Sequence, residues 1–194
     1  MKSTLLAISI VMALFGTADS QTRRQQQDHF RIARIRVEGT GQFTTSEVIA
    51  ISGLNPESIA SPEVLDMVRK RLLRAYHNRG CLQAHVAVTT NYEAPVLGEM
   101  RKAEVEIEIQ EGPVFVLRRL EFMGNKMTRD RIIRRRVLLN EGEPYSEDLL
   151  EASLERLNEL GLFTRITMRD VTRALVERGR FVDLLIRLRE KGKR

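Results

Sequence analysis

The sequence is poor in the residues that disulfide-bonded domains and single-strand-binding proteins depend on, with one cysteine, no tryptophan and only 5% aromatic residues. The single Cys81 excludes an intramolecular disulfide and any metal site built from several cysteines, so we expect stability to come from packing. The scarcity of aromatics argues against a stacking platform for single-stranded nucleic acid. At 194 residues, the chain has room for one ordinary domain or two small ones, which excludes a large multidomain enzyme.

The sequence also lacks an apolar run long enough to span a bilayer. Its nearly unbroken run at residues 5–16 has 12 residues, whereas a spanning helix needs about 20. A positive charge precedes the run and small residues follow it, so residues 1–20 are predicted to be a signal peptide cut after Ser20, with a cut after Ala18 as the alternative. Residues 21–29 are then a flexible leader. This predicts a chain that acts outside the cytoplasm, and an uncleaved membrane anchor is the other interpretation.

Positive charge is concentrated near the C-terminus. Residues 114–194 contain 19 Lys and Arg against 13 Asp and Glu, whereas residues 30–113 contain 10 against 11. The densest cluster contains Arg118, Arg119, Arg129, Arg131, Arg134, Arg135 and Arg136. We predict that Arg131, Arg134 and Arg135 contact an acidic partner or anionic head groups, and the alternative is a solvated helix face.

The sequence contains two copies of one unit. Gly39 and Gly124 each close an apolar-alternating run and lie 85 residues apart, and Ser61 and Ser146, which each open a helical pattern, have the same spacing. Internal repeats indicate duplicated supersecondary units. We therefore expect one domain over residues 30–113, a second over residues 114–190, and a basic tail at 191–194.

Both copies show the same order of patterns: strand, short helix, long helix, strand, strand. Thr44 and Glu47 have capping-box spacing at the first short helix, and Pro62 suits the first position of the long helix. Residues 103–109 alternate strictly between apolar and polar, which is typical of a half-buried strand. The prediction is an α+β chain with two tandem β-α-α-β-β domains, each a three-stranded mixed sheet covered by two helices.

Several stretches in the order of the chain carry a family resemblance. They are residues 72–82, Val105 to Pro113 running on to Gly124-Asn125, and Leu157 to Phe163. Together they resemble consecutive polypeptide-transport-associated (POTRA) domains of BamA- and TamA-type outer-membrane assembly proteins, over residues 31–190. The resemblance implies a periplasmic docking module for outer-membrane protein assembly or polypeptide translocation. Its partners would be outer-membrane protein clients, barrel-assembly components or the outer-membrane surface.

The sequence departs from the family at two places. Cys81 stands where the family often has an aromatic residue. The chain also ends six residues after Leu188, which leaves no room for a transmembrane barrel of about 8 strands. We expect either a POTRA-only periplasmic protein or the soluble part of a longer one.

By this resemblance, the strand after each long helix is an exposed sheet edge, which nominates residues 83–90 and 164–171. Such an edge has unpaired backbone groups that can bind an extended segment as an added strand. The candidate contact residues are Gln83, His85, Ala87, Thr89, Arg165, Thr167 and Arg169. The alternative is that the edges are solvated or covered by loops.

Nothing in the sequence points to catalysis. His29, His77 and His85 lack metal-ligand spacing, Cys81 has no activating neighbour in sequence, and the alternating glutamates of residues 104–108 belong to an open sheet face. We expect no enzyme, cofactor, metal, small-molecule substrate or nucleic acid. The competing hypotheses are a basic nucleic-acid-binding protein and a membrane-anchored division or scaffold protein with POTRA-like domains.

Overall fold

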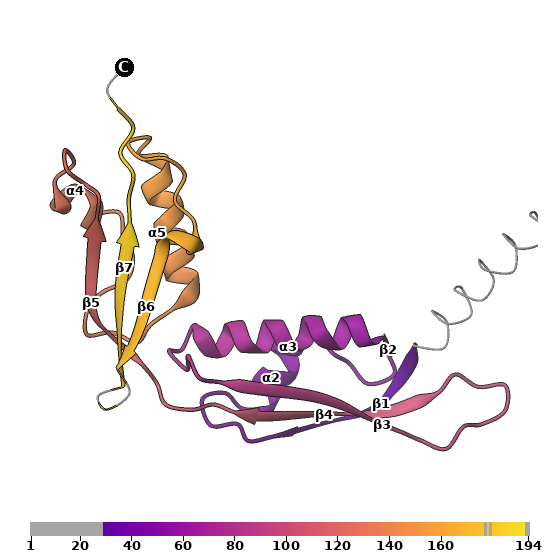
Figure 1. Cartoon of the computed structure of the whole chain (residues 1–194). Coiled ribbons are helices and arrows are strands. Elements are labelled where there is room, and N and C mark those ends of the chain that lie inside the picture. Colours follow the sequence, from indigo (N-terminus) through magenta and orange to yellow (C-terminus); the bar gives the residue numbers. More distant parts are fainter. Residues whose placement is uncertain (1–28, 177, 179, 193–194) are drawn as a thin grey trace, which may run out of the picture.

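The computed structural model describes residues 29–176, 178 and 180–192. The predicted signal peptide and nearly all of the predicted leader lie outside these residues. The described chain forms two α+β domains, each with its own buried apolar cluster (Figure 1). Among the described residues, no helix has the length and apolar character needed to cross a membrane.

The N-terminal domain contains a four-stranded sheet in the order β2-β1-β4-β3. Strand β4 pairs in parallel with β1 and antiparallel with β3, so the sheet is mixed as predicted. Helix α3 lies along one face of the sheet (Figure 1). The elements are β1 (Phe30–Glu38), α2 (Thr45–Ser52), β2 (Ile59–Ala60), α3 (Pro62–His77), β3 (His85–Tyr92) and β4 (Lys102–Gln110).

The prediction of three strands in this domain was wrong because of β2. This two-residue strand pairs antiparallel with the start of β1, at Phe30 and Arg31, and the Ile32 N–H donates to the Ser58 carbonyl beside it. Two residues are too few to show an alternating pattern, so the sequence carries no signal for this strand.

The C-terminal domain has the predicted three strands, in the order β5-β7-β6, with β7 parallel to β5 and antiparallel to β6. Helix α5 runs beside this sheet, and the short α4 lies at the end of the domain remote from the N-terminal domain (Figure 1). The elements are β5 (Val116–Met123), α4 (Asp130–Arg134), α5 (Glu147–Glu159), the 3-10 turn η1 (Met168–Asp170), β6 (Val171–Val176) and β7 (Phe181–Arg187).

The repeat extends to backbone detail. Strands β1 and β5 each contain an irregularity in register, between Ile32 and Arg34 and between Leu117 and Arg119. A Cβ atom placed on Gly39 would lie 2.0 Å from the Ile109 carbonyl oxygen, and one on Gly124 would lie 2.0 Å from the Leu188 carbonyl oxygen. The two glycines therefore occupy equivalent positions, where β1 and β5 end against the last strand of their domains.

A glutamate after the last strand of each domain reinforces this equivalence. The Glu111 carboxylate accepts hydrogen bonds from the N–H groups of Gly41 and Gln42 at 2.6 and 2.7 Å. The Glu190 carboxylate does the same for the loop after β5, where Met127 and Thr128 donate. Carboxylates on backbone donors make strong, charge-assisted hydrogen bonds, so both loops are tied to the sheets.

The predicted strand at residues 164–171 was placed too early in the chain. The Asn158 side chain accepts from the Ile166 N–H at 2.7 Å and donates to the Ile166 carbonyl at 2.9 Å. Thr167 and Asp170 then form a capping box around the 3-10 turn. Because these side chains occupy the backbone groups, pairing with β7 begins only at Val171.

Candidate docking edges and the joint between the domains

Strand β3 is the longer of the two predicted sheet edges. It pairs with β4 along one side and is the last strand of its sheet. Because the Glu93 N–H donates to the Lys102 carbonyl, the alternating ladder turns the odd-numbered residues of β3 toward β4. The N–H and C=O groups of Val86, Val88 and Thr90 consequently point to the open side, where no bond to another described segment satisfies them.

The structure places the four candidate residues of this edge differently. His85, Ala87 and Thr89 lie on β3, on the face opposite buried Val86, and His85 and Thr89 are exposed. Gln83 precedes the strand in a turn and has contacts of its own. The edge is therefore His85–Tyr92, two residues further along the chain than predicted.

Strand β6 is the edge of the C-terminal sheet. Arg165, Thr167 and Arg169 were expected on this edge, but they precede it in the irregular segment and the 3-10 turn. The exposed residues of the actual strand run from Thr172 to Leu175. A cavity of about 300 Å³ opens beside them, lined by His77, Leu82, Arg173 and Leu175, so it lies between the two domains.

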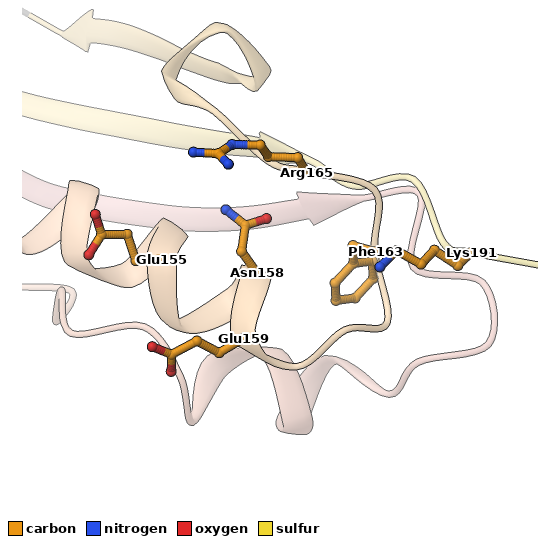
Figure 2. Close-up of a pocket in the computed structure, with 6 residues that line it drawn as sticks. All are labelled: Glu155, Asn158, Glu159, Phe163, Arg165 and Lys191. Atoms are coloured by element: carbon orange, nitrogen blue, oxygen red, sulfur yellow. The ribbon is translucent and has the colours of Figure 1, made fainter.

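Arg165 instead borders a shallow cavity of about 530 Å³ at the end of α5. Figure 2 shows Asn158 on the helix, with Arg165 on the facing segment and Glu155 and Glu159 along the helix. The cavity combines the carboxylates of Glu155 and Glu159 with the cations of Arg165 and Lys191, and none of the described residues forms a group that could hold a metal ion. The cavity is an open, mixed polar depression.

The domains meet where the last turn of α3 approaches the first turn of α5. The Arg74 guanidinium donates to Asp148 and to Glu151, each at 2.6 Å. Asn78 donates to the Asp148 carboxylate at 2.5 Å and accepts from the Asp148 N–H at 2.9 Å. Cations at a helix C-terminus and carboxylates at a helix N-terminus are each favoured by the helix dipole. The joint therefore matches opposite charges across the domain boundary.

The linker packs on both sides of the joint. Val114 packs against the N-terminal core, while Phe115 is fully buried in the C-terminal core. The Phe115 N–H donates to the carbonyl of Gly80, just after α3, at 2.8 Å. Leu82 from the N-terminal domain packs against the C-terminal core. These contacts restrict the relative orientation of the two domains.

Sequence reasoning missed the carboxylate at the centre of this joint. Glu147 Oε2 lies 3.1 Å from Nδ1 of His77, and Glu147 Oε1 lies 3.3 Å from the Arg173 guanidinium. The hydrogen bond to His77 holds the pKa of Glu147 below its usual range, against the opposing effect of partial burial and with help from the Arg173 charge. The only sequence signal for this role of Glu147 is its place at the acidic start of helix α5.

We predict that acid weakens the joint through Glu147. Because its folded pKa is lowered, the stabilisation is complete above the unfolded value of about 4.3 and is lost as pH falls through the folded pKa. Carboxyl NMR titration of Glu147, followed together with interdomain chemical-shift changes, measures this. In Glu147→Gln, the interdomain shifts should no longer follow that titration, whereas Glu155→Gln on the exposed side of the same helix should leave them as in the wild type.

The basic cluster splits into bonded and unbonded arginines. Arg134 donates to Asp130 and to the Leu120 carbonyl, each at 2.7 Å, so it is a structural residue. Arg118 makes two hydrogen bonds to Asp183. The exposed side chains of Arg129, Arg131, Arg135 and Arg136 have no ion pair or hydrogen bond with other described residues. Of the three predicted contact arginines, Arg131 and Arg135 are thus available.

The described residues contain neither an exposed cysteine nor a group of metal ligands. Cys81 is fully buried, and burial is the main cause that raises the pKa of its thiol. Such a thiol is a poor nucleophile. Within residues 29–176, 178 and 180–192, no three His, Cys, Asp or Glu residues lie close enough to hold a metal ion.

Comparison with known families explains the duplicated architecture. The profile of the POTRA family, described as surface antigen variable number repeat, matches residues 30–112 and again residues 115–191. The chain belongs to the POTRA family. The prediction of this family is thereby confirmed. We refer to the N-terminal domain of the chain as POTRA domain 1 and to the C-terminal domain as POTRA domain 2. POTRA domains are typically non-catalytic, and in BamA-family proteins they are typically periplasmic.

The proteins that this POTRA pair resembles include an outer-membrane protein assembly factor. The chain is 22% identical over 138 residues to outer membrane protein assembly factor BamA of Neisseria meningitidis serogroup B, which is 71% of this chain and 17% of that protein. POTRA domains 3–5 of Haemophilus influenzae BamA match with a TM-score of 0.65 and 18% identity, over 83% of this chain and 61% of theirs. Haemophilus ducreyi BamA lacking POTRA domains 1–3 matches with a TM-score of 0.69 and 18% identity, over 84% of this chain and 30% of that one.

These relatives are longer than the present chain. It spans less than two thirds of each of them. At this identity, the similarity of the solved structures shows the fold, namely two α+β domains with sheets of four and three strands. The chain is consistent with an outer-membrane protein assembly or transport module.

Proposed function

We propose that this POTRA pair binds extended segments of outer-membrane proteins or of their assembly machinery along strand β3, outside the cytoplasm. The observation that carries the proposal is the open side of β3, an eight-residue strand whose outward backbone groups lack partners in the described chain. An extended segment added there would satisfy them as a further antiparallel or parallel strand. Backbone pairing tolerates many side chains, which suits a module that meets different clients.

Strand β6 supports a shorter second contact of the same kind. Its exposed part carries Leu175 beside the cavity between the domains. A segment paired with β6 would place alternate side chains toward this cavity, next to Leu82 and His77. The cavity is open only while the joint holds the domains in this arrangement, so the joint would control this contact.

A proline at Thr90 tests binding along β3. The Thr90 N–H faces the open side, so Thr90→Pro removes a docking donor while keeping every bond to β4. We expect affinity for an extended outer-membrane strand peptide to fall about tenfold or more, since an unpaired acceptor costs about 1–3 kcal/mol. Fluorescence anisotropy of the labelled peptide measures this.

Two matched variants complete that test. Thr90→Ala removes the side chain and should bind like the wild type, whereas Thr89→Pro removes a bond to β4 and should lower thermal stability. A photo-crosslinker at exposed Thr89 in intact cells should trap outer-membrane proteins, and one at Met67 on α3 should not. Equal affinity of the Thr90→Pro and wild-type proteins would contradict the proposal.

A further inference from the structure

The far end of POTRA domain 2 combines unbonded positive charge with exposed apolar side chains. The loop after β5 and helix α4 lie at the end of the domain away from the joint, beside the end of β5 (Figure 1). Met127 is 76% exposed and Ile132 is 41% exposed. We define the α4 patch as Met127, Arg129, Arg131, Ile132, Arg135 and Arg136.

The acidic groups near the α4 patch are already engaged. Asp130 and Glu141 both face Arg134, at 2.7 and 3.6 Å. Glu190 accepts from the backbone of the loop, and Glu121 lies 3.5 Å from Arg119. No described carboxylate forms an ion pair with Arg129, Arg131, Arg135 or Arg136. The four positive charges therefore face outward without compensation from the protein.

The helix orients these charges together with one apolar side chain. Ile133 is fully buried and fixes the inward face of α4. At about 100° per residue, Arg131 and Arg135 fall on the face opposite Ile133, while Ile132 lies about 100° from Ile133, on the side of the helix next to Arg135. Ile132 is 41% exposed beside these unbonded arginines, so this side of the helix suits a surface that is both anionic and apolar.

We propose that the α4 patch binds an anionic phospholipid bilayer, with the four arginines at the phosphate level and with Met127 and Ile132 entering the head-group boundary. An acidic protein would satisfy the arginines but would need a matching apolar pocket for the two exposed apolar side chains. A fluid bilayer supplies anionic groups and apolar depth without fixed geometry. This surface is separate from the β3 edge, so it is independent of client binding.

Vesicle binding by the purified protein tests the charge requirement. We expect sedimentation with vesicles of phosphatidylethanolamine and phosphatidylglycerol at 3:1, decreasing as salt rises, and no sedimentation with phosphatidylcholine vesicles. Arg131→Gln with Arg135→Gln should weaken binding roughly 30-fold, because each arginine near an anionic surface contributes about a fivefold factor. The control pair Arg34→Gln with Arg156→Gln removes two exposed arginines elsewhere and should leave binding unchanged.

The absence of tryptophan provides a direct measure of insertion. The Ile132→Trp variant should show a blue shift of its tryptophan fluorescence with anionic vesicles, and this fluorescence should be quenched by brominated lipids. Met67→Trp, on α3 at a comparable 49% exposure, should show neither. Circular dichroism confirms that each variant remains folded.

Three results with vesicles would overturn this proposal. They are no binding of the wild type to anionic vesicles, an equal loss in the control arginine pair, and charge-dependent binding without a spectral shift at position 132. Binding to polyglutamate but not to vesicles would also overturn it, and would identify the patch as a site for acidic protein.

Discussion

Gly124→Ala should unfold POTRA domain 2 or lower its stability by more than about 4 kcal/mol, a size reserved for severe structural conflicts. The new Cβ would lie 2.0 Å from the Leu188 carbonyl oxygen, at a φ of +100°. The Leu188 N–H donates to the Met123 carbonyl at 2.7 Å, so the strands cannot separate at this point without breaking that bond. Chemical denaturation followed by circular dichroism measures the loss.

Gly142→Ala is the matched control for this prediction. Gly142 has a φ of +92°, but an added Cβ would meet nothing within 4 Å. The substitution should therefore cost only the free energy of holding a residue with a Cβ atom at positive φ, about 1–2 kcal/mol. Gly39→Ala should reproduce the large effect in POTRA domain 1, where the contact is the Ile109 carbonyl oxygen. Similar losses for Gly124→Ala and Gly142→Ala would show that the close approach is not the cause.

Arg74→Glu should release the two domains from their common orientation. The substitution replaces two attractions, to Asp148 and Glu151, with two repulsions across the joint. Since these pairs are about half exposed, we expect only about 1–2 kcal/mol in total, which still shifts the balance of joined and separated orientations by roughly 5- to 30-fold. NMR residual dipolar couplings should then give different alignment tensors for the two domains.

Lys70→Glu provides the same change of charge one turn earlier on α3, where Lys70 pairs with Asp66 within the helix. It should leave the alignment tensors matched. Adding Asp148→Lys and Glu151→Lys to Arg74→Glu should restore the common orientation. If Arg74→Glu leaves the tensors matched, the apolar contacts of Leu82 and Phe115 hold the joint without the ion pairs.

The sequence was informative wherever local chemistry and periodicity agreed. The 85-residue spacing of Gly39 and Gly124 indicated the duplication, and the two glycines make the same backbone contact in both domains. Thr44 and Glu47 form the predicted capping box. The alternation of residues 103–109 predicted strand β4, which spans Lys102–Gln110.

The misplaced elements depend on long-range partners that have no local pattern. Strand β2 exists only because β1 starts beside it. The strand predicted at residues 164–171 is displaced because Asn158, on the preceding helix, binds the Ile166 backbone. The separation of Arg134 from Arg131 and Arg135 likewise depends on Asp130, Glu141 and the Leu120 carbonyl, contacts that arise only on folding.

The opposite packing of two consecutive linker residues limits how this protein can vary. Val114 belongs to one core and Phe115 to the other, so an insertion or deletion of a single residue between them and β4 would shift both side chains away from the cores that they fill. A neighbour of different size or shape, such as Pro113 or Val116, would then have to take the vacated place. Changes in length should consequently accumulate in the surface loops of each domain, while the distance between the domains along the chain stays fixed.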